Sequence, residues 1–301
     1  MIEAVNSDIR RQEYRLMAQL CPTLGPLVGS ALELFDGKPA SGWSFYVLRR
    51  DPDRARRPLL EGEVRRGAAC AALALRGRSG WLACPPCDAL WETDAASNGK
   101  AQPLDEEAVE RWGIDPEELT GFLEFLGIER LTTPGPGPLG WPSRPLARMG
   151  AGPALCCPPA PAGLTLETAA PVGEVADLVM AGREPDARDD FYAEACARRN
   201  HGLGHFWLAR LPNGRAAATV SAWAVWHGQA YMAMGLTAPD LRGRGYSGWL
   251  IPAMAKSLLR EGLTPTFLCR EALLPFYRRQ GMVQIGEYRQ YYTESSELDV
   301  E

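Results

Sequence analysis

The stretch that decides the fold is Leu241-Arg242-Gly243-Arg244-Gly245-Tyr246-Ser247-Gly248. It follows an apolar run over residues 229–238 and precedes a helical pattern over residues 249–260, so the predicted order is strand, glycine-rich turn, helix. Glycines let backbone N–H groups approach a ligand closely, and the first N–H groups of a helix have no internal partner. Such a turn suits a phosphate or pyrophosphate. The alternative is a basic surface turn in which the glycines serve only the backbone geometry.

The turn also resembles a known signature. Residues 242–247 are similar to the R-x-x-G-x-G/A coenzyme A signature of the GCN5-related N-acetyltransferases, the GNAT superfamily, with Ser247 as a departure at the last small position. Downstream, Ala272-Leu273-Leu274-Pro275-Phe276-Tyr277-Arg278-Arg279-Gln280-Gly281-Met282 resembles the second family signature, A-x-x-F-Y-x-x-x-G-F. The residues of this second signature are most similar to those of the arylalkylamine N-acetyltransferase branch. The resemblance extends over residues 164–293.

This resemblance implies both a fold and a coenzyme site. The fold would be α+β, a GNAT-type mixed sheet flanked by helices, and acetyl-CoA would be the acyl-donor substrate. Family strands that precede this turn splay from the next strand at a bulge, and Gly235 fits such a bulge. Gly235 has a second explanation, which is packing against a neighbouring aromatic side chain. The coenzyme-binding residues would be Leu236, Thr237, Ala238, Arg242, Gly243, Arg244, Gly245, Tyr246, Ser247 and Gly248.

Tyr277 matches the catalytic acid of the family. A phenol, whose ordinary pKa is about 10, stays protonated at neutral pH and suits a departing thiolate whose acid has a pKa of about 8.5. Residues 271–280 are expected to form the helix that carries Tyr277, and Gly281 is expected to end it. Leu273 and Leu274 share its helical face, which leaves the alternative that Tyr277 is only a core aromatic.

No base for the acceptor amine is visible on residues 229–237, and a water chain is an equal alternative to a side chain. The candidate bases are Glu194, His201, His205 and Glu271. Cys269-Arg270 stand where the family often has Asn, which puts one coenzyme contact in doubt. The two histidines have helical metal spacing, but the glycines between them argue against a helix. Cys84-Pro85-Pro86-Cys87 is half of a zinc site without a second pair, so no metal is expected.

Composition restricts the class of protein. The chain has 301 residues, which favours two domains, and its 46% hydrophobic and 23% charged residues are ordinary for a globular protein. A net charge of −5 gives no support for nucleic-acid binding. No apolar run approaches the roughly 20 residues of a membrane helix, and the polar residues 1–15 do not resemble a secretory signal. Scattered cysteines suggest reduced thiols, so a cytoplasmic location is expected.

Residues 133–163 are dense in Pro and Gly, a composition typical of a linker, and the predicted domains are residues 1–159 and 160–301. Expected in the first are helices over 7–19, 26–35 and 115–126, strands over 43–48, 68–75, 81–84 and 128–131, loops over 51–57 and 93–102, and a candidate last strand over 144–149. We hypothesise a smaller, degenerate and coenzyme-free GNAT-like copy. The alternative is an unrelated α+β domain.

The second domain has a pattern that matches the family order. Expected are strands over 164–168, 206–211, 216–226 and 229–237, helices over 172–181 and 189–199, and a polar loop over 182–188. Asp189 or Asp190 would cap the second helix. Pro252 falls inside the helix that follows the glycine-rich turn, so that helix should begin late or be irregular in its first turn.

These features together indicate an acetyl-CoA-dependent N-acetyltransferase that acts on a primary amine of a small molecule or peptide by direct attack. The alternative is a non-catalytic acyl-CoA-binding regulatory protein. The missing base favours the regulator, and Tyr277 favours the enzyme. Neither nucleic acid nor membrane is expected as a partner. The acceptor and the oligomeric state are not readable from the sequence.

Overall fold

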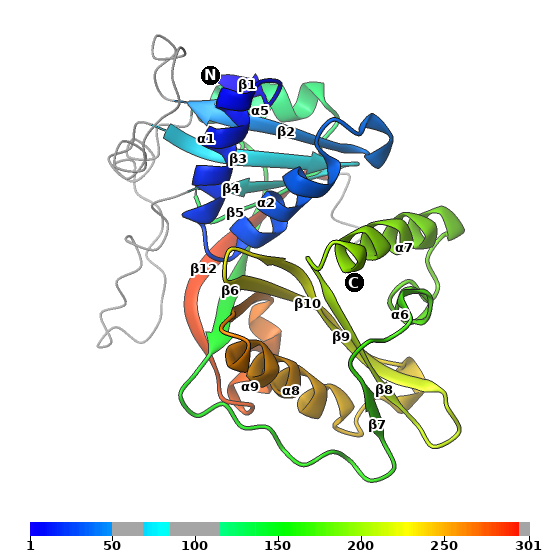
Figure 1. The fold of residues 1–301 in the computed structure, drawn as a ribbon. Coiled ribbons are helices and arrows are strands. Elements are labelled where there is room, and N and C mark those ends of the chain that lie inside the picture. Colours follow the sequence, from blue (N-terminus) through cyan, green and yellow to red (C-terminus); the bar gives the residue numbers. More distant parts are fainter. Residues whose placement is uncertain (50–68, 85–114, 136, 295–301) are drawn as a thin grey trace, which may run out of the picture. The chain divides into compact units, whose positions relative to one another are not determined.

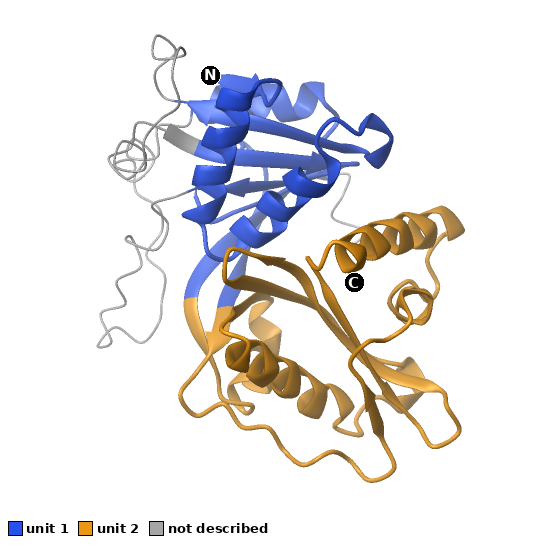
Figure 2. Ribbon diagram, viewed as in Figure 1, with its two compact units in different colours: residues 1–148, 286–301 blue, residues 149–285 orange. Residues whose placement is uncertain are grey.

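The computed structural model describes residues 1–49, 69–84, 115–135 and 137–294 (Figure 1). The chain forms two compact units, residues 1–148 with 286–301 and residues 149–285 (Figure 2). We call them unit 1 and unit 2. The loops predicted over 51–57 and 93–102, and residues 85–87 of the cysteine motif, lie outside the described residues.

Unit 1 is a mixed sheet flanked by helices. Its elements are β1 (Ile2–Ala4), α1 (Asp8–Gln19), α2 (Leu24–Phe35), η1 (Pro39–Ser41), β2 (Trp43–Arg49), β3 (Ala69–Arg76), β4 (Ser79–Ala83), α5 (Pro116–Phe125) and β5 (Arg130–Thr133). The strand order is β1-β2-β3-β4-β5-β12, where β12 is Met282–Tyr292. Only β4 and β5 pair in parallel among these strands.

Neighbouring aromatic residues of β2 show that unit 1 has two packed faces. The Phe45 ring meets Tyr14 of α1 at 5.7 Å between centroids, and the Tyr46 ring meets Phe122 of α5 at 4.9 Å. Successive side chains of a strand point to opposite faces, so α1 and α5 cover opposite faces of this sheet. Side chains cap α1 and α5, because Ser7 accepts from Arg10 N at 3.4 Å and Asp115 accepts from two N–H groups of α5.

Unit 2 repeats the same order of elements. It contains β7 (Thr165–Glu167), α6 (Val172–Val179), α7 (Pro185–Asn200), β8 (His205–Arg210), β9 (Ala216–Trp226), β10 (Gln229–Thr237), η4 (Pro239–Leu241), α8 (Tyr246–Arg260), β11 (Thr264–Cys269), η5 (Glu271–Leu273) and α9 (Leu274–Arg278). The strand order is β7-β8-β9-β10-β11, and again only the last pair is parallel. The predicted α+β class is confirmed.

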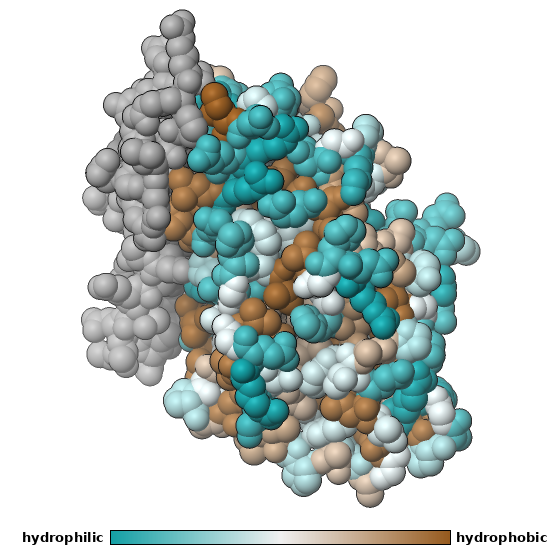
Figure 3. Space-filling model, viewed as in Figure 1, coloured by the Kyte–Doolittle hydropathy of each residue, from teal (hydrophilic) through white to brown (hydrophobic). Residues whose placement is uncertain are grey.

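The helices of unit 2 lie on both faces of its sheet. Figure 1 shows α6 and α7 on one face of β8–β10, and α8 and α9 on the other. The exposed sides of α1 and α7 are largely hydrophilic in the space-filling view (Figure 3). This division of each helix into a polar side and a packed side is typical of helices that cover a sheet.

Three helix predictions need correction because of proline. The loop predicted over 182–188 and the cap predicted at Asp189 or Asp190 are both wrong. Helix α7 begins at Pro185 with Glu184 as its cap, and Pro is well suited to a first helical position. The helix predicted over 271–280 is only α9, because Pro275 has no N–H to continue from η5. The helix with Pro252 inside it begins early, at Tyr246, rather than late.

The proline- and glycine-rich stretch is not wholly a linker. Strand β6 (Ser143–Ala151) lies within it, as the candidate last strand suggested, and residues 146–150 are buried. Gly152 N donates to Gly281 O at 3.1 Å, and Cys156 N donates to Gln280 O at 3.0 Å. Unit 2 therefore begins at Met149, ahead of the domain boundary predicted between residues 159 and 160.

Candidate functional site

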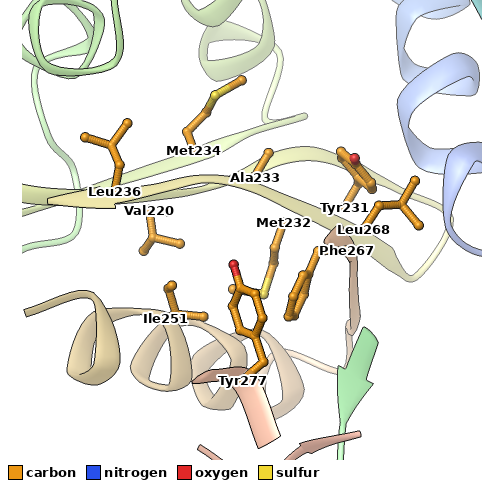
Figure 4. Close-up of a pocket in the computed structure, with 11 residues that line it drawn as sticks. Val220, Tyr231, Met232, Ala233, Met234, Leu236, Ile251, Phe267, Leu268 and Tyr277 are labelled. Atoms are coloured by element: carbon orange, nitrogen blue, oxygen red, sulfur yellow. The ribbon is translucent and has the colours of Figure 1, made fainter. Parts of the chain in front are cut away.

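A cavity opens where two parallel strands part. Strands β10 and β11 pair only from Gln229 to Tyr231 and from Thr264 to Thr266, although β10 continues to Thr237. A cavity of about 270 Å³ lies at this divergence (Figure 4). Its walls come from β9, β10, α8, β11 and α9, through Val220, Tyr231, Met232, Ala233, Met234, Gly235, Leu236, Ile251, Phe267, Leu268 and Tyr277.

The predicted bulge in β10 is present beside the cavity. The register between β10 and β9 shifts twice, after Tyr231 and between Ala233 and Leu236, and Met234 has φ +57°. Gly235 lies inside the second shift. A Cβ on Gly235 would stand 2.9 Å from Cδ1 of Ile251, so a side chain here would collide with α8. The predicted packing partner was aromatic, whereas the residue that meets Gly235 is aliphatic.

The glycine-rich turn has the geometry of an anion site. Gly243 and Gly245 both have φ +79°, a conformation that L side chains rarely adopt. Gly245 caps α8 without a side-chain hydrogen bond, so the first N–H groups of this helix remain available to a ligand. Arg242 and Arg244 are exposed on the same turn and add positive charge.

Contacts on both sides hold this turn in place. Thr237 Oγ1 and Ser247 Oγ are 2.6 Å apart, which joins the end of β10 to the start of α8. Ala238 and Leu241 are buried with Ala217 of β9, and Tyr246 packs against this cluster. Among the predicted coenzyme residues, the side chains of Ala238 and Tyr246 therefore pack within the protein. Leu236, in contrast, lines the cavity.

Gly248 completes this set in the first turn of α8. A Cβ there would lie 4.0 Å from Phe276, the neighbour of Tyr277. The start of α8 and the start of α9 are therefore adjacent.

Tyr277 reaches the cavity from α9. Figure 4 shows its hydroxyl directed toward β10, across the cavity from the strand's backbone. The ring packs against Phe267 at 4.6 Å and Phe276 at 5.1 Å between centroids. Burial, followed by the influence of Cys269, raises the pKa of Tyr277 to about 12. The side chain is thus both a packed aromatic and a protonated donor facing the cavity.

Tyr231 is a cavity residue that motif reasoning did not identify. Burial, with a contribution from Tyr277, raises the pKa of Tyr231 to about 12. Its position at the last β10–β11 pair could have been found by asking where the two strands must part. The apolar wall formed by Met232, Ile251 and Phe267 gave no such signal, because apolar residues at these positions look like ordinary core.

None of the four candidate bases is among the residues that line the cavity. Glu194 is buried and paired with Arg198 at 2.8 Å, and His201 holds the Ala197 carbonyl at 2.9 Å. Glu271 is exposed in η5, and His205 begins β8. In the part of the chain that the structure describes, no group of three or more His, Cys, Asp or Glu side chains could hold a metal ion. No described helix is long and apolar enough to span a membrane.

Comparison with known proteins points to one family. A family model described as "Acetyltransferase (GNAT) family" matches residues 173–282, a segment within unit 2 that contains the glycine-rich turn and Tyr277. This match confirms the family resemblance of the two signatures. The arylalkylamine branch stays a prediction. No curated protein matches the chain.

Three solved structures align with 97% of the chain. They are a tandem GNAT protein from the clavulanic acid biosynthesis pathway (15% identity, 98% of that chain, TM-score 0.55), a GCN5-related N-acetyltransferase from Sphaerobacter thermophilus (16%, 95%, 0.55) and a Drosophila protein (14%, 98%, 0.54). At these identities the likeness concerns the fold alone. A tandem GNAT fold agrees with the repeated element order of the two units, so unit 1 fits the hypothesis of a second GNAT-like copy.

The coenzyme-free character of unit 1 stays a prediction. Its counterpart of the glycine-rich turn would follow β4, and residues 85–114 lie outside the described part of the chain.

Proposed function

We propose that the protein is an acetyl-CoA-dependent N-acetyltransferase that moves the acetyl group to a primary amine of a small molecule or peptide. The supporting observation is the divergence of β10 from β11, which opens a cavity lined by Leu236 near the end of β10 and by Tyr277. The glycine-rich turn follows β10 along the chain, so an anion held there would lie next to this end of the strand. A molecule with a pyrophosphate at one end and a reactive thioester at the other suits this arrangement.

The coenzyme binds through backbone groups more than through side chains. The N–H groups from Gly243 to Gly248 receive the pyrophosphate, with Arg242 and Arg244 as additional charges. The pantetheine arm lies along residues 236–238, and its amides pair with the edge of β10 at residues 236 and 237, which β11 no longer covers. An unpaired strand edge offers N–H and C=O groups to an extended ligand.

The chemistry is direct attack. The neutral amine nitrogen forms a bond to the thioester carbonyl carbon, and the C–S bond then breaks with its electron pair on sulfur. Tyr277 gives its hydroxyl proton to that thiolate. The burial that raises the pKa of the phenol keeps Tyr277 protonated until the thiolate forms, and the same apolar wall disfavours the thiolate anion and so favours its protonation. A water chain carries away the amine proton, and a proton from solvent restores the Tyr277 hydroxyl before the next turnover.

Tyr277→Phe tests this role because it removes the donor and keeps the packed ring. We expect kcat to fall by roughly 10²- to 10⁴-fold, with little change in coenzyme affinity or thermal stability. Tyr231→Phe is the matched control, since it removes the other phenol of the same cavity. A Tyr277→Phe enzyme with kcat within about threefold of the parent would remove Tyr277 from the mechanism.

A non-catalytic acyl-CoA-binding regulator is the second candidate. It is favoured by one observation: among the described residues, no carboxylate or imidazole lines the cavity. Thiol release from acetyl-CoA, measured over a panel of primary amines, separates the two. Tight coenzyme binding without amine-dependent thiol release would support the regulator.

We also propose a cytoplasmic location. Cys156 and Cys157 carry free thiols at or near the surface, which suits a reducing compartment.

A further inference from the structure

An ion pair lies beside the turn that we propose for the pyrophosphate. Arg215 Nη1 donates to Asp240 Oδ2 at 2.7 Å, and Arg215 Nη2 donates to Asp240 Oδ1 at 2.6 Å. Two parallel bonds fix the geometry of an arginine–carboxylate contact, and both side chains of this pair are about half exposed, at 49% and 55%. Asp240 lies in η4, two residues before Arg242, whereas Arg215 comes from the connection between β8 and β9.

The backbone around each partner is held independently. Arg215 N donates to Asn213 Oδ1 at 3.1 Å, and Arg215 O accepts from Leu211 N at 2.9 Å. On the other side, Ala238 N donates to Ala217 O at 2.9 Å, and Leu241 is buried next to Asp240. Backbone hydrogen bonds therefore fix the chain at Arg215 and near Asp240, so the ion pair forms between two segments that are already held in place.

A carboxylate at this position conflicts with an anion site. Asp240 lies four residues before Arg244, at the entry to the glycine-rich turn. The hydrogen bonds from Arg215 are the largest cause that lowers the pKa of Asp240, and the charge of Arg244 makes a smaller contribution in the same direction. Without Arg215, the Asp240 carboxylate would repel the pyrophosphate and attract Arg244 away from it. Compensation of the carboxylate charge lessens this repulsion.

We propose, building on the proposed function, that Arg215 is a positioning residue for the coenzyme. It neutralises Asp240 and so leaves Arg244 available to the pyrophosphate. Arg215 lies outside both family-like signatures, and the structure alone brings it to the turn.

A double-mutant cycle tests this role. The variants are Arg215→Gln, Asp240→Asn and the pair together, and the measurement is coenzyme A affinity by calorimetry at low and physiological salt. We expect Arg215→Gln to weaken binding about fivefold at low salt and less at higher salt, because exposed charges are screened. Asp240→Asn alone should bind as well as the parent or better. The double variant should match Asp240→Asn, because no carboxylate remains to be compensated.

Two controls separate this electrostatic role from a structural one. Arg188→Gln removes another exposed ion pair of unit 2, with Asp177 at 2.6 Å, and should leave coenzyme affinity unchanged. An N-acetylcysteamine thioester has no phosphates, so its turnover should be the same in the parent and in Arg215→Gln.

The results that contradict the inference are distinct from failure of the proposed function. If the coenzyme A affinity of Arg215→Gln is within about twofold of the parent's affinity, the inference is overturned. A double variant as weak as Arg215→Gln would also overturn it, because Arg215 would then contact the coenzyme itself. If the parent protein binds no coenzyme A, the proposed function fails, and the inference fails with it.

Discussion

At the scale of single residues, Tyr277 serves packing and chemistry at once. Its ring lies against Phe267 and Phe276, while its hydroxyl faces the cavity. The two interpretations offered by the sequence, core aromatic and proton donor, are therefore compatible. The packing holds the ring, and a held ring keeps the hydroxyl in one position.

The raised pKa of Tyr277 predicts the alkaline side of the pH–rate profile. A group with a pKa of about 12 stays protonated as pH rises through 10, where an ordinary tyrosine would lose its proton. We expect kcat to rise as the amine loses its proton and not to fall before about pH 11. A rate profile measured to pH 10.5 checks this. A fall near pH 8 or 9 would assign the acid to another group.

The same shift predicts a matching change in stability, which serves as the control for that profile. The unfolded tyrosine loses its proton from about pH 10, whereas the folded one keeps it to about 12, so the unfolded state binds fewer protons between these values. The contribution of Tyr277 to the free energy of unfolding is therefore fully present below pH 10 and declines as the pH rises toward 12. Intrinsic fluorescence recorded alongside the rates separates unfolding from loss of the acid.

At the scale of elements, the glycine-rich turn depends on a glycine with positive φ. Helix α8 has such a glycine at each of its two ends. Gly245 precedes α8 with φ +79°, and Gly262 follows it with φ +78°. Neither would place a Cβ within 4 Å of other atoms. A side chain introduced at either position would be strained in the same way. The two positions differ in that the proposed coenzyme approaches only Gly245.

Gly245→Ala and Gly262→Ala form a matched pair on this basis. Each should lose about 1 kcal/mol of stability, because a side chain in the left-handed region is strained. Only Gly245→Ala should also lose coenzyme A affinity, by about tenfold or more, since its Cβ stands at the turn. Calorimetry and thermal unfolding on both variants give the comparison. Equal coenzyme A affinities for the two variants would contradict the assignment of the pyrophosphate to this turn.

At the scale of the whole molecule, unit 1 is discontinuous in sequence. Strand β12 begins in unit 2, and its later residues belong to unit 1, where Arg289 to Tyr292 pair antiparallel with β5. Tyr288 is 2% exposed, with its hydroxyl 3.6 Å from Sγ of Cys21. The later part of β12 is therefore part of the core that the first residues of the chain form.

Tyr288→Ala should destabilise unit 1 although the substitution lies in the C-terminal strand. We expect a loss of about 3 to 5 kcal/mol, the usual cost of removing a large buried aromatic side chain. Val283→Ala is the control on the same strand, because Val283 is 37% exposed and lies in unit 2. Denaturant unfolding of the two variants measures the difference. Similar midpoints for both would mean that β12 is dispensable to unit 1.

The sequence by itself determined much of the local structure and the family resemblance of the second unit. Ser7 and Asp115 cap the predicted helices, and the strands over 216–226 and 229–237 have the predicted bounds. The glycine-rich turn and Tyr277 lie in the matched family segment. These features depend on residues within a few positions of each other, and such neighbours favour caps, turns and strands before any tertiary contact forms.

The tertiary structure alone decided the cavity, the Arg215–Asp240 pair and the division of β12 between two units. The cavity depends on where β10 stops pairing with β11, and its walls come from elements far apart in the chain. Strand pairing and side-chain packing at such separations are set by the free energy of the whole fold. No short pattern of residues encodes them, because each participating residue also fits an ordinary core or surface position.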